Sequence, residues 1–217
     1  MAVTGTETVR DIITDALLDI QAVNEGEDIP ASQAAQALRV MNRLMKSWQL
    51  MDGSPAFLKA SQSVTATTSA AHTMSPIRPL RVLSVRLKGT DGNETSMVEM
   101  TREEYDQLPD KDATGTPTQW YYDRQKEAAR LYVWPLFSAV TTETFEVTYG
   151  REFEDIASLN DVIDLPGEWY DVAVRQLSAR LAPSYGVKDP NLDMKAAYAL
   201  NLALAAGMEH QSVFWRA

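Results

Sequence analysis

The fold is decided by residues 165–181, which read Leu165-Pro166-Gly167-Glu168-Trp169-Tyr170-Asp171-Val172-Ala173-Val174-Arg175-Gln176-Leu177-Ser178-Ala179-Arg180-Leu181. Pro166 fits the first turn of a helix, where its missing N–H costs nothing, and Glu168 suits the positive end of the helix dipole. The apolar residues then recur at helical spacing, at Tyr170, Ala173, Val174, Leu177 and Leu181. The opposite side carries Asp171, Arg175 and Ser178. This pattern predicts an amphipathic helix over 165–182 that needs other helices against its apolar side.

Two further amphipathic helices are predicted near the N-terminus, over residues 8–22 and 31–50. In the first, the apolar residues match helical spacing throughout: Val9, Ile12, Ile13, Ala16, Leu17 and Ile20. The second follows Pro30, with Ser32 as the candidate N-cap, and Asp52-Gly53 stops it. Because only a short loop joins the two helices, we expect them to form an antiparallel hairpin.

The middle of the chain, from Ser54-Pro55 to about Gly150, has the composition of strands and turns. Strands are predicted at 57–68, 80–87, 120–123, 130–135 and 144–149. Asp91-Gly92 predicts a tight hairpin turn, with residues 97–100 as the returning strand. Thr101 and Glu104 have the spacing of a capping box and predict a short helix between strands.

A last helix is predicted over about 191–208, where Asn201 is the only strongly polar side chain from Ala196 to Met208. A helix that is apolar nearly all round is buried on several sides, in a bundle or between subunits. The order of elements predicts an α+β fold, in which a helical bundle built from the N- and C-terminal helices is interrupted by an all-β insertion domain. The predicted domains are 1–53 with 160–217 for the bundle, and 54–159 for the β-rich insertion.

Composition excludes several functional classes. A net charge of −10 and a pI of about 4.7 argue against a general nucleic-acid binder, which carries a basic patch. The chain has no cysteine, so thiolate chemistry is excluded, and no stretch approaches 18 consecutive apolar residues, so no membrane anchor is expected. His72 and His210 are far apart, and no metal, nucleotide or nucleophile motif is present. We therefore expect no cofactor, no metal and no catalytic residue.

The first helix carries a carboxylate at every fourth position: Glu7, Asp11, Asp15 and Asp19. The simplest interpretation is a solvated face whose first members suit the helix dipole. The alternative is an acidic channel surface, past which a polyanion slides because like charge prevents adhesion at short range. Arg39, Arg43 and Lys46 of the second helix are candidates for pairing with this row.

The aromatic residues of the middle segment leave a second class of function open. Side chains that could stack on sugars are Trp120, Tyr121, Tyr122, Tyr132 and Trp134. Aromatic residues at strand spacing are more often core and cross-strand pairs. Glu103 and Glu104 could supply an acid and a base beside them. The alternative function is therefore a carbohydrate-binding or peptidoglycan-acting module.

Several segments match a known pattern in order and spacing. They are residues 8–17, 37–48, 77–82, Tyr105, 115–123, 131–135, 163–169 and Tyr185-Gly186. Together they resemble the head-to-tail adaptor proteins of tailed bacteriophages, the family that includes the tail accessory factor of short-tailed phages. Residues 61–75 depart from that pattern because they lack a glycine near the first β turn.

The resemblance implies a structural, non-enzymatic virion protein at the head–tail junction, assembled in the host cytoplasm. It implies a ring, usually of twelve copies, that joins the portal protein to the tail proteins (nozzle, tube or fibre). Genomic DNA would pass through the ring without sequence-specific binding. The helical part and a C-terminal segment of about 209–217 would dock on the portal, and the β part would face the tail. The portal-binding candidates are Val213, Phe214, Trp215 and Arg216, of types that anchor interfaces.

Overall fold

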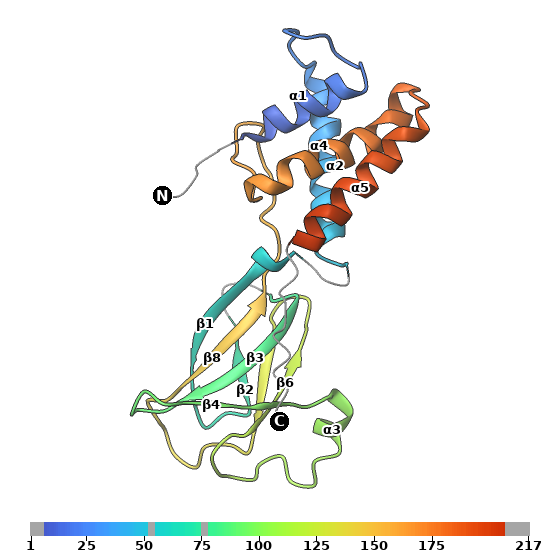
Figure 1. Cartoon of the computed structure of the whole chain (residues 1–217). Helices are drawn as coiled ribbons and strands as arrows, with labels where there is room; N and C mark the ends of the chain where they lie inside the picture. The colour runs from blue at the N-terminus through green and yellow to red at the C-terminus, as the bar shows by residue number, and fades with distance from the viewer. Residues whose placement is uncertain (1–6, 52–54, 75–77, 207–217) are drawn as a thin grey trace, which may run out of the picture. The chain divides into compact units, whose positions relative to one another are not determined.

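The chain forms an α+β fold, and the computed structural model describes residues 7–51, 55–74 and 78–206. Contacts divide it into two compact units (Figure 1). One unit contains residues 1–57 and 153–217 and is helical; the other contains residues 58–152 and is built mainly of strands. Segments from both ends of the chain therefore build one unit, while the other is continuous in sequence.

Helix α4 (Tyr170–Leu181) is the central element of the helical unit. It contacts α1 (Val9–Asp19), α2 (Ala31–Trp48) and α5 (Pro190–Ala206). Figure 1 shows α4 and α5 side by side, as their contacts require. The 3₁₀ turns η2 (Gly167–Trp169) and η3 (Ala182–Tyr185) flank α4, and Pro166 precedes the first of them in an extended conformation.

The helix that decides the fold buries a slightly different face from the predicted one. The buried side chains are Val172, Ala173, Leu177, Ser178 and Leu181, while Tyr170 and Val174 are half-buried. Ser178 was predicted on the polar side, yet it is fully buried. Its hydroxyl lies 2.8 Å from the carbonyl oxygen of Val174 and 3.2 Å from that of Ala16, and donates to them. A serine can take this position because the bond to its own helix satisfies the hydroxyl group.

The N-terminal helices have capping arrangements that differ from the prediction. Thr8 caps α1 in a reciprocal box with Asp11, whose backbone N–H donates to Thr8 Oγ1 at 3.3 Å. The helix ends at Asp19 rather than at residue 22, because Gln21 adopts a positive φ of 57°. Helix α2 begins directly after Pro30, with no side-chain cap, so the assignment of Ser32 as N-cap was wrong.

Four aromatic rings fill the part of the helical unit where the chain leaves it and returns. Trp48 and Trp169 lie edge to face with ring centroids 5.5 Å apart. Phe57 lies 5.5 Å from Trp169, and Phe153 lies 6.3 Å from Trp48 and 5.9 Å from Phe57. We call these four residues the aromatic cluster. It fixes the last residue before the β-rich unit and the first residue after it.

Residues 153–159 belong to the helical unit, whereas the sequence boundary placed them in the β-rich insertion. Side chains of α2 and its C-cap bind their backbone. Asn42 accepts a hydrogen bond from the Ile156 N–H at 3.0 Å and donates to the Ile156 carbonyl at 2.9 Å. Lys46 donates to the Phe153 carbonyl at 3.0 Å, and Gln49 accepts from the Phe153 N–H at 3.1 Å. An irregular segment of this kind has no periodicity from which its neighbours could be predicted.

The β-rich unit contains two four-stranded sheets, ordered β1-β8-β3-β4 and β2-β7-β6-β5. The first is formed by β1 (Lys59–Thr65), β3 (Arg81–Lys88), β4 (Glu94–Ser96) and β8 (Thr144–Gly150). The second is formed by β2 (Ala71–Thr73), β5 (Val98–Glu99), β6 (Gln119–Asp123) and β7 (Arg130–Trp134). Buried side chains of both sheets, such as Val147 and Leu131, form one shared core.

The hairpin after β3 is shorter than predicted. Gly92 has a φ of 83°, as the tight turn requires, and Lys88 pairs with Glu94. The returning strand is therefore β4, not residues 97–100. Val98 and Glu99 instead form β5, which pairs in parallel with β6 in the other sheet. The predicted capping box of Thr101 is confirmed at the start of α3 (Arg102–Asp106).

Helix α5 buries one face on α4 and exposes another. Its buried side chains are Leu192, Ala196, Ala199, Leu200 and Ala203. Met194, Tyr198 and Leu202 are 65%, 69% and 60% exposed. Among the described residues, this helix is therefore covered on one side only. None of the helices within the described residues has the length and apolarity needed to cross a membrane.

Candidate functional site

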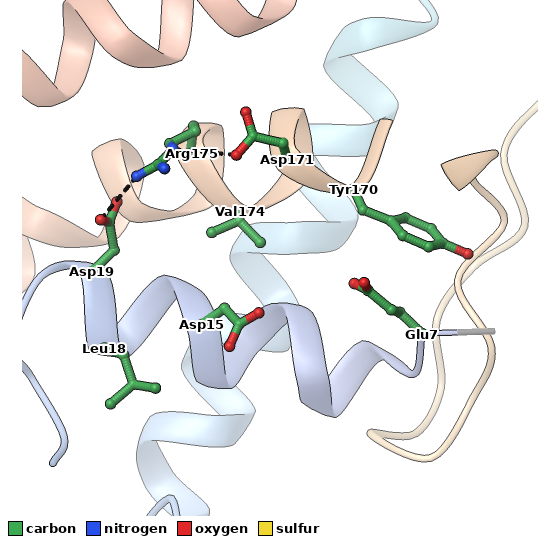
Figure 2. Close-up of a pocket in the computed structure, with 8 residues that line it drawn as sticks. All are labelled: Glu7, Asp15, Leu18, Asp19, Tyr170, Asp171, Val174 and Arg175. Atoms are coloured by element: carbon green, nitrogen blue, oxygen red, sulfur yellow. Dashed lines mark hydrogen bonds and ion pairs between the residues drawn. The ribbon is translucent and has the colours of Figure 1, made fainter. Parts of the chain in front are cut away.

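Part of the predicted carboxylate row lies in a groove between α1 and α4, of about 560 Å³ (Figure 2). Helix α1 and the residue before its cap contribute Glu7, Asp15, Leu18 and Asp19, and α4 contributes Tyr170, Asp171, Val174 and Arg175. We call this the acidic groove. Four of the eight lining residues are carboxylates and one is a guanidinium, so the groove is strongly negative.

The entry to α1 is held in place by backbone contacts. The N–H groups of Val9 and Arg10 donate to the carbonyls of Asp161 and Leu159, at 3.0 and 2.9 Å. Thr8 also forms an isolated β-bridge with Val162. These bonds position Glu7 at the end of the groove, where Figure 2 shows its carboxylate close to the ring of Tyr170.

Arg175 is the one cation that lines the acidic groove. Its Nη1 lies 3.0 Å from Asp19 and its Nε lies 3.3 Å from Asp171, so it joins α1 to α4 and also spans one turn of α4 (Figure 2). Asp15 and Glu7 have no such cation beside them in the groove. Burial raises the pKa of Glu7, and the nearby charges of Asp15 and Asp11 raise it further.

The fourth member of the predicted row, Asp11, has a different role. Its carboxylate accepts hydrogen bonds from the Thr8 hydroxyl at 2.6 Å and the Thr8 N–H at 2.9 Å. These bonds lower the pKa of Asp11. Glu7, Asp15 and Asp19 therefore share the groove, while Asp11 serves as a helix cap. The capping box could have been predicted from the Thr8–Asp11 spacing, since aspartate is also suited to a first turn.

The predicted pairing between the acidic row and the cations of α2 is not what the described residues show. Lys46 pairs with Asp155 at 2.9 Å, and the acidic row pairs with Arg175 of α4. Arg39 and Arg43 are exposed. Helical spacing identifies the faces of α1, α2 and α4 but not which faces meet, and for that reason the part played by Arg175 was missed.

The acidic groove is suited to repelling anions and attracting cations. In the part of the chain that the structure describes, no group of three or more His, Cys, Asp or Glu side chains is arranged to hold a metal ion. The predicted portal-binding residues Val213, Phe214, Trp215 and Arg216 lie outside the described residues.

The aromatic residues of the alternative, carbohydrate-directed interpretation are mostly engaged in packing. Trp120 is 2% exposed and lies in the core of the β-rich unit. The indole N–H of Trp134 donates to the Asp110 carbonyl at 3.0 Å. Tyr122 donates to the Pro79 carbonyl at 2.6 Å, and burial raises its pKa to about 12.

The tyrosines and the glutamate of that interpretation are also accounted for locally. Tyr121 stacks on Tyr105 and on Tyr132, while Tyr105 and Tyr132 are tilted against each other, and the ring centroids of the three pairs are 5.2–5.8 Å apart. Glu104 accepts the Thr101 N–H at 2.7 Å as the capping residue of α3, and this bond lowers its pKa. A general acid needs a raised pKa, so Glu104 is suited to capping and not to acid catalysis.

Comparison with known proteins adds one strong match. Residues 7–213 match the family model described as "SU10 adaptor protein". No match was found among curated proteins.

Two solved structures are similar at low identity. The first, "Virion of native gene transfer agent (GTA) particle", has 16% identity and a TM-score of 0.33, and the match covers 88% of this chain and 84% of that one. The second, "Neck of empty GTA particle computed with C6 symmetry", has 15% identity and a TM-score of 0.29, with 77% of each chain covered. These scores are below the level at which a common fold follows.

Proposed function

The chain belongs to the SU10 adaptor protein family, and from this premise we propose that it is a structural head–tail connector of a virion, without catalytic activity. The observation that carries the proposal is the extent of the family match, which runs over residues 7–213 and therefore through both compact units. A match confined to one unit would leave the other free for a separate activity.

We further propose that copies of the chain form a ring that joins the portal protein to the tail proteins. Twelve copies are the number that the adaptor resemblance suggests. A ring built from heterologous contacts closes without a self-complementary patch on each subunit. The segment 209–217, with its aromatic pair Phe214 and Trp215, is the proposed contact with the portal, and the β-rich unit is the proposed contact with the tail.

The acidic character of the chain supports a passive relation to DNA. Most non-specific affinity for duplex DNA comes from cations of the protein that release counterions from the phosphates. Carboxylates cannot do this, and the chain has a net charge of −10 and a groove lined by four carboxylates. In the proposed ring, DNA passes without being held. The Glu7, Asp15 and Asp19 side chains are candidates for the surface that faces it.

The test is binding of the full-length chain to purified portal rings, compared with a chain that ends at residue 208. The proposal expects loss of binding on truncation, and a similar loss in the double variant Phe214→Ala, Trp215→Ala. The control is Val140→Ala, which changes an apolar side chain that is 88% exposed in the β-rich unit. Unchanged affinity of the truncated chain would refute the docking role of segment 209–217.

A further inference from the structure

The outer face of α5 is unusual among the helices of this chain. It presents Met194, Tyr198 and Leu202 at successive turns, and each of these side chains is at least 60% exposed. Two exposed alanines, Ala197 and Ala205, lie before Tyr198 and after Leu202. No charged residue occurs from Ala196 to Ala206. The exposed faces of α1 and α2 instead carry charges, such as Asp15 and Arg39. A helix whose two opposite faces are both apolar is covered on both of them in its working state.

A second surface of the helical unit has matching properties. It is a shallow groove of about 350 Å³ on the outer side of α2, lined by Asn42, Arg43, Lys46, Ser47, Leu50 and Asp155. Leu50 is 71% exposed. The alkyl stems of Arg43 and Lys46 give the groove apolar walls, while their charged ends and Asp155 form a polar rim. We call this the α2 groove.

We infer that the apolar face of α5 in one copy packs into the α2 groove of the next copy. This inference rests on the proposed function, because it assigns the contact between neighbours in the proposed ring. Both surfaces belong to one compact unit, and both stay exposed within it, so they do not cover each other in a single chain. Contact between them requires two copies and is heterologous, which is the type of contact that closes rings.

The chemistry of the two surfaces fits contact with a second copy better than contact with DNA. DNA needs several cations, and within the described part of α5 Lys195 is the one cationic side chain. Tyr198 and Asn201 bring a hydroxyl and an amide to an otherwise apolar face, and both can bond to the polar rim formed by Arg43 and Asp155. Tyrosine is also among the residues that dominate interface energies.

Cross-linking tests the contact directly, because the chain has no cysteine of its own. The variants are Leu50→Cys, Leu202→Cys and the double variant, treated with a short bismaleimide as full-length protein, concentrated or mixed with portal rings. The double variant is expected to form a ladder of trimers and larger species. Each single variant alone stays uncross-linked, and a mixture of the two gives dimers. The control pair, Leu50→Cys with Val140→Cys, is expected to give no product.

The outcomes separate this inference from the proposed function. Oligomers that are seen by native mass spectrometry but lack the cross-link between positions 50 and 202 would overturn the interface alone. Efficient dimers of Leu202→Cys by itself would also overturn it, because they would place α5 against α5. A chain that stays monomeric both alone and in the presence of portal rings would refute the ring and the interface together. Independently, Tyr198→Ala is expected to weaken self-association at least about tenfold, since it removes the one aromatic side chain of the contact face.

Discussion

Truncation of Trp169 tests the role of the aromatic cluster in the helical unit. Trp169 is 3% exposed and contacts both Trp48 and Phe57 edge to face. Replacing a buried tryptophan with alanine costs about 3–5 kcal/mol in lost transfer free energy and cavity formation. Each edge-to-face pair accounts for roughly 0.5–1.5 kcal/mol beyond burial. We therefore expect Trp169→Ala to lower the free energy of unfolding of the helical unit by about 4 kcal/mol.

The measurement is urea denaturation of the full chain, followed by far-ultraviolet circular dichroism, whose signal comes mainly from the helices. With an m-value of about 2 kcal/mol/M, the expected loss shifts the helical midpoint by roughly 2 M. Trp169→Phe is the matched control, since it keeps an aromatic edge against Trp48 and should lose less than half as much. A shift of the helical midpoint below about 0.5 M, equivalent to about 1 kcal/mol at this m-value, would refute the reasoning.

Three further predictions concern single side chains. Burial lowers the pKa of His72, whose Nε2 accepts a hydrogen bond from the Thr67 N–H at 3.1 Å, so on acidification the unfolded state binds the proton first. The free energy of unfolding should therefore fall as the pH drops below about 6.5 and level off below the folded-state pKa. Denaturation measured over this pH range should show a flatter dependence for His72→Gln. Ser178→Ala should cost about 1 kcal/mol by thermal unfolding, because the hydroxyl lost is fully buried and bonded; an unchanged melting temperature would contradict that role. Arg175→Gln should cost no more than about 1 kcal/mol, because the pair with Asp19 is partly exposed, and added salt should reduce the difference between variant and parent; a loss that does not depend on salt would show that packing, not charge, is involved.

Periodicity predicted which segments are helical and which are extended, but not which of them are neighbours. Strands β1 and β7 fall within predicted strands, and β3, β6 and β8 each extend one residue beyond theirs. Nothing local indicates that β8 lies between β1 and β3, antiparallel to both. Sheet order is set by which apolar faces pack together, and alternation along one strand contains no information on its partners. Membership of the adaptor family, predicted from the order of short segments, is confirmed by the match over residues 7–213.

The acidic site was predicted only in part, for the same reason. Asp15 and Asp19 belong to α1, and Glu7, which precedes the cap of α1, lines the same groove. Asp171 and Arg175 lie more than 150 positions further along the chain, and only the packing of α4 on α1 brings them into the groove. Ser178 was misassigned because a hydroxyl bonded to its own helix can be buried at low cost, which a polar-versus-apolar pattern does not represent.

The central position of α4 has a consequence for how the protein is made. Helices α1 and α2 leave the ribosome before α4, but the helix that covers them is complete only after Leu181, more than 130 residues beyond Trp48. At ordinary elongation rates their apolar faces wait on the order of ten seconds for that partner. The β-rich unit is finished during this interval, since its last strand ends at Gly150. A prematurely terminated chain can therefore contain a complete β-rich unit but no helical unit, and cannot be built into an assembly whose contacts depend on α2 and α5.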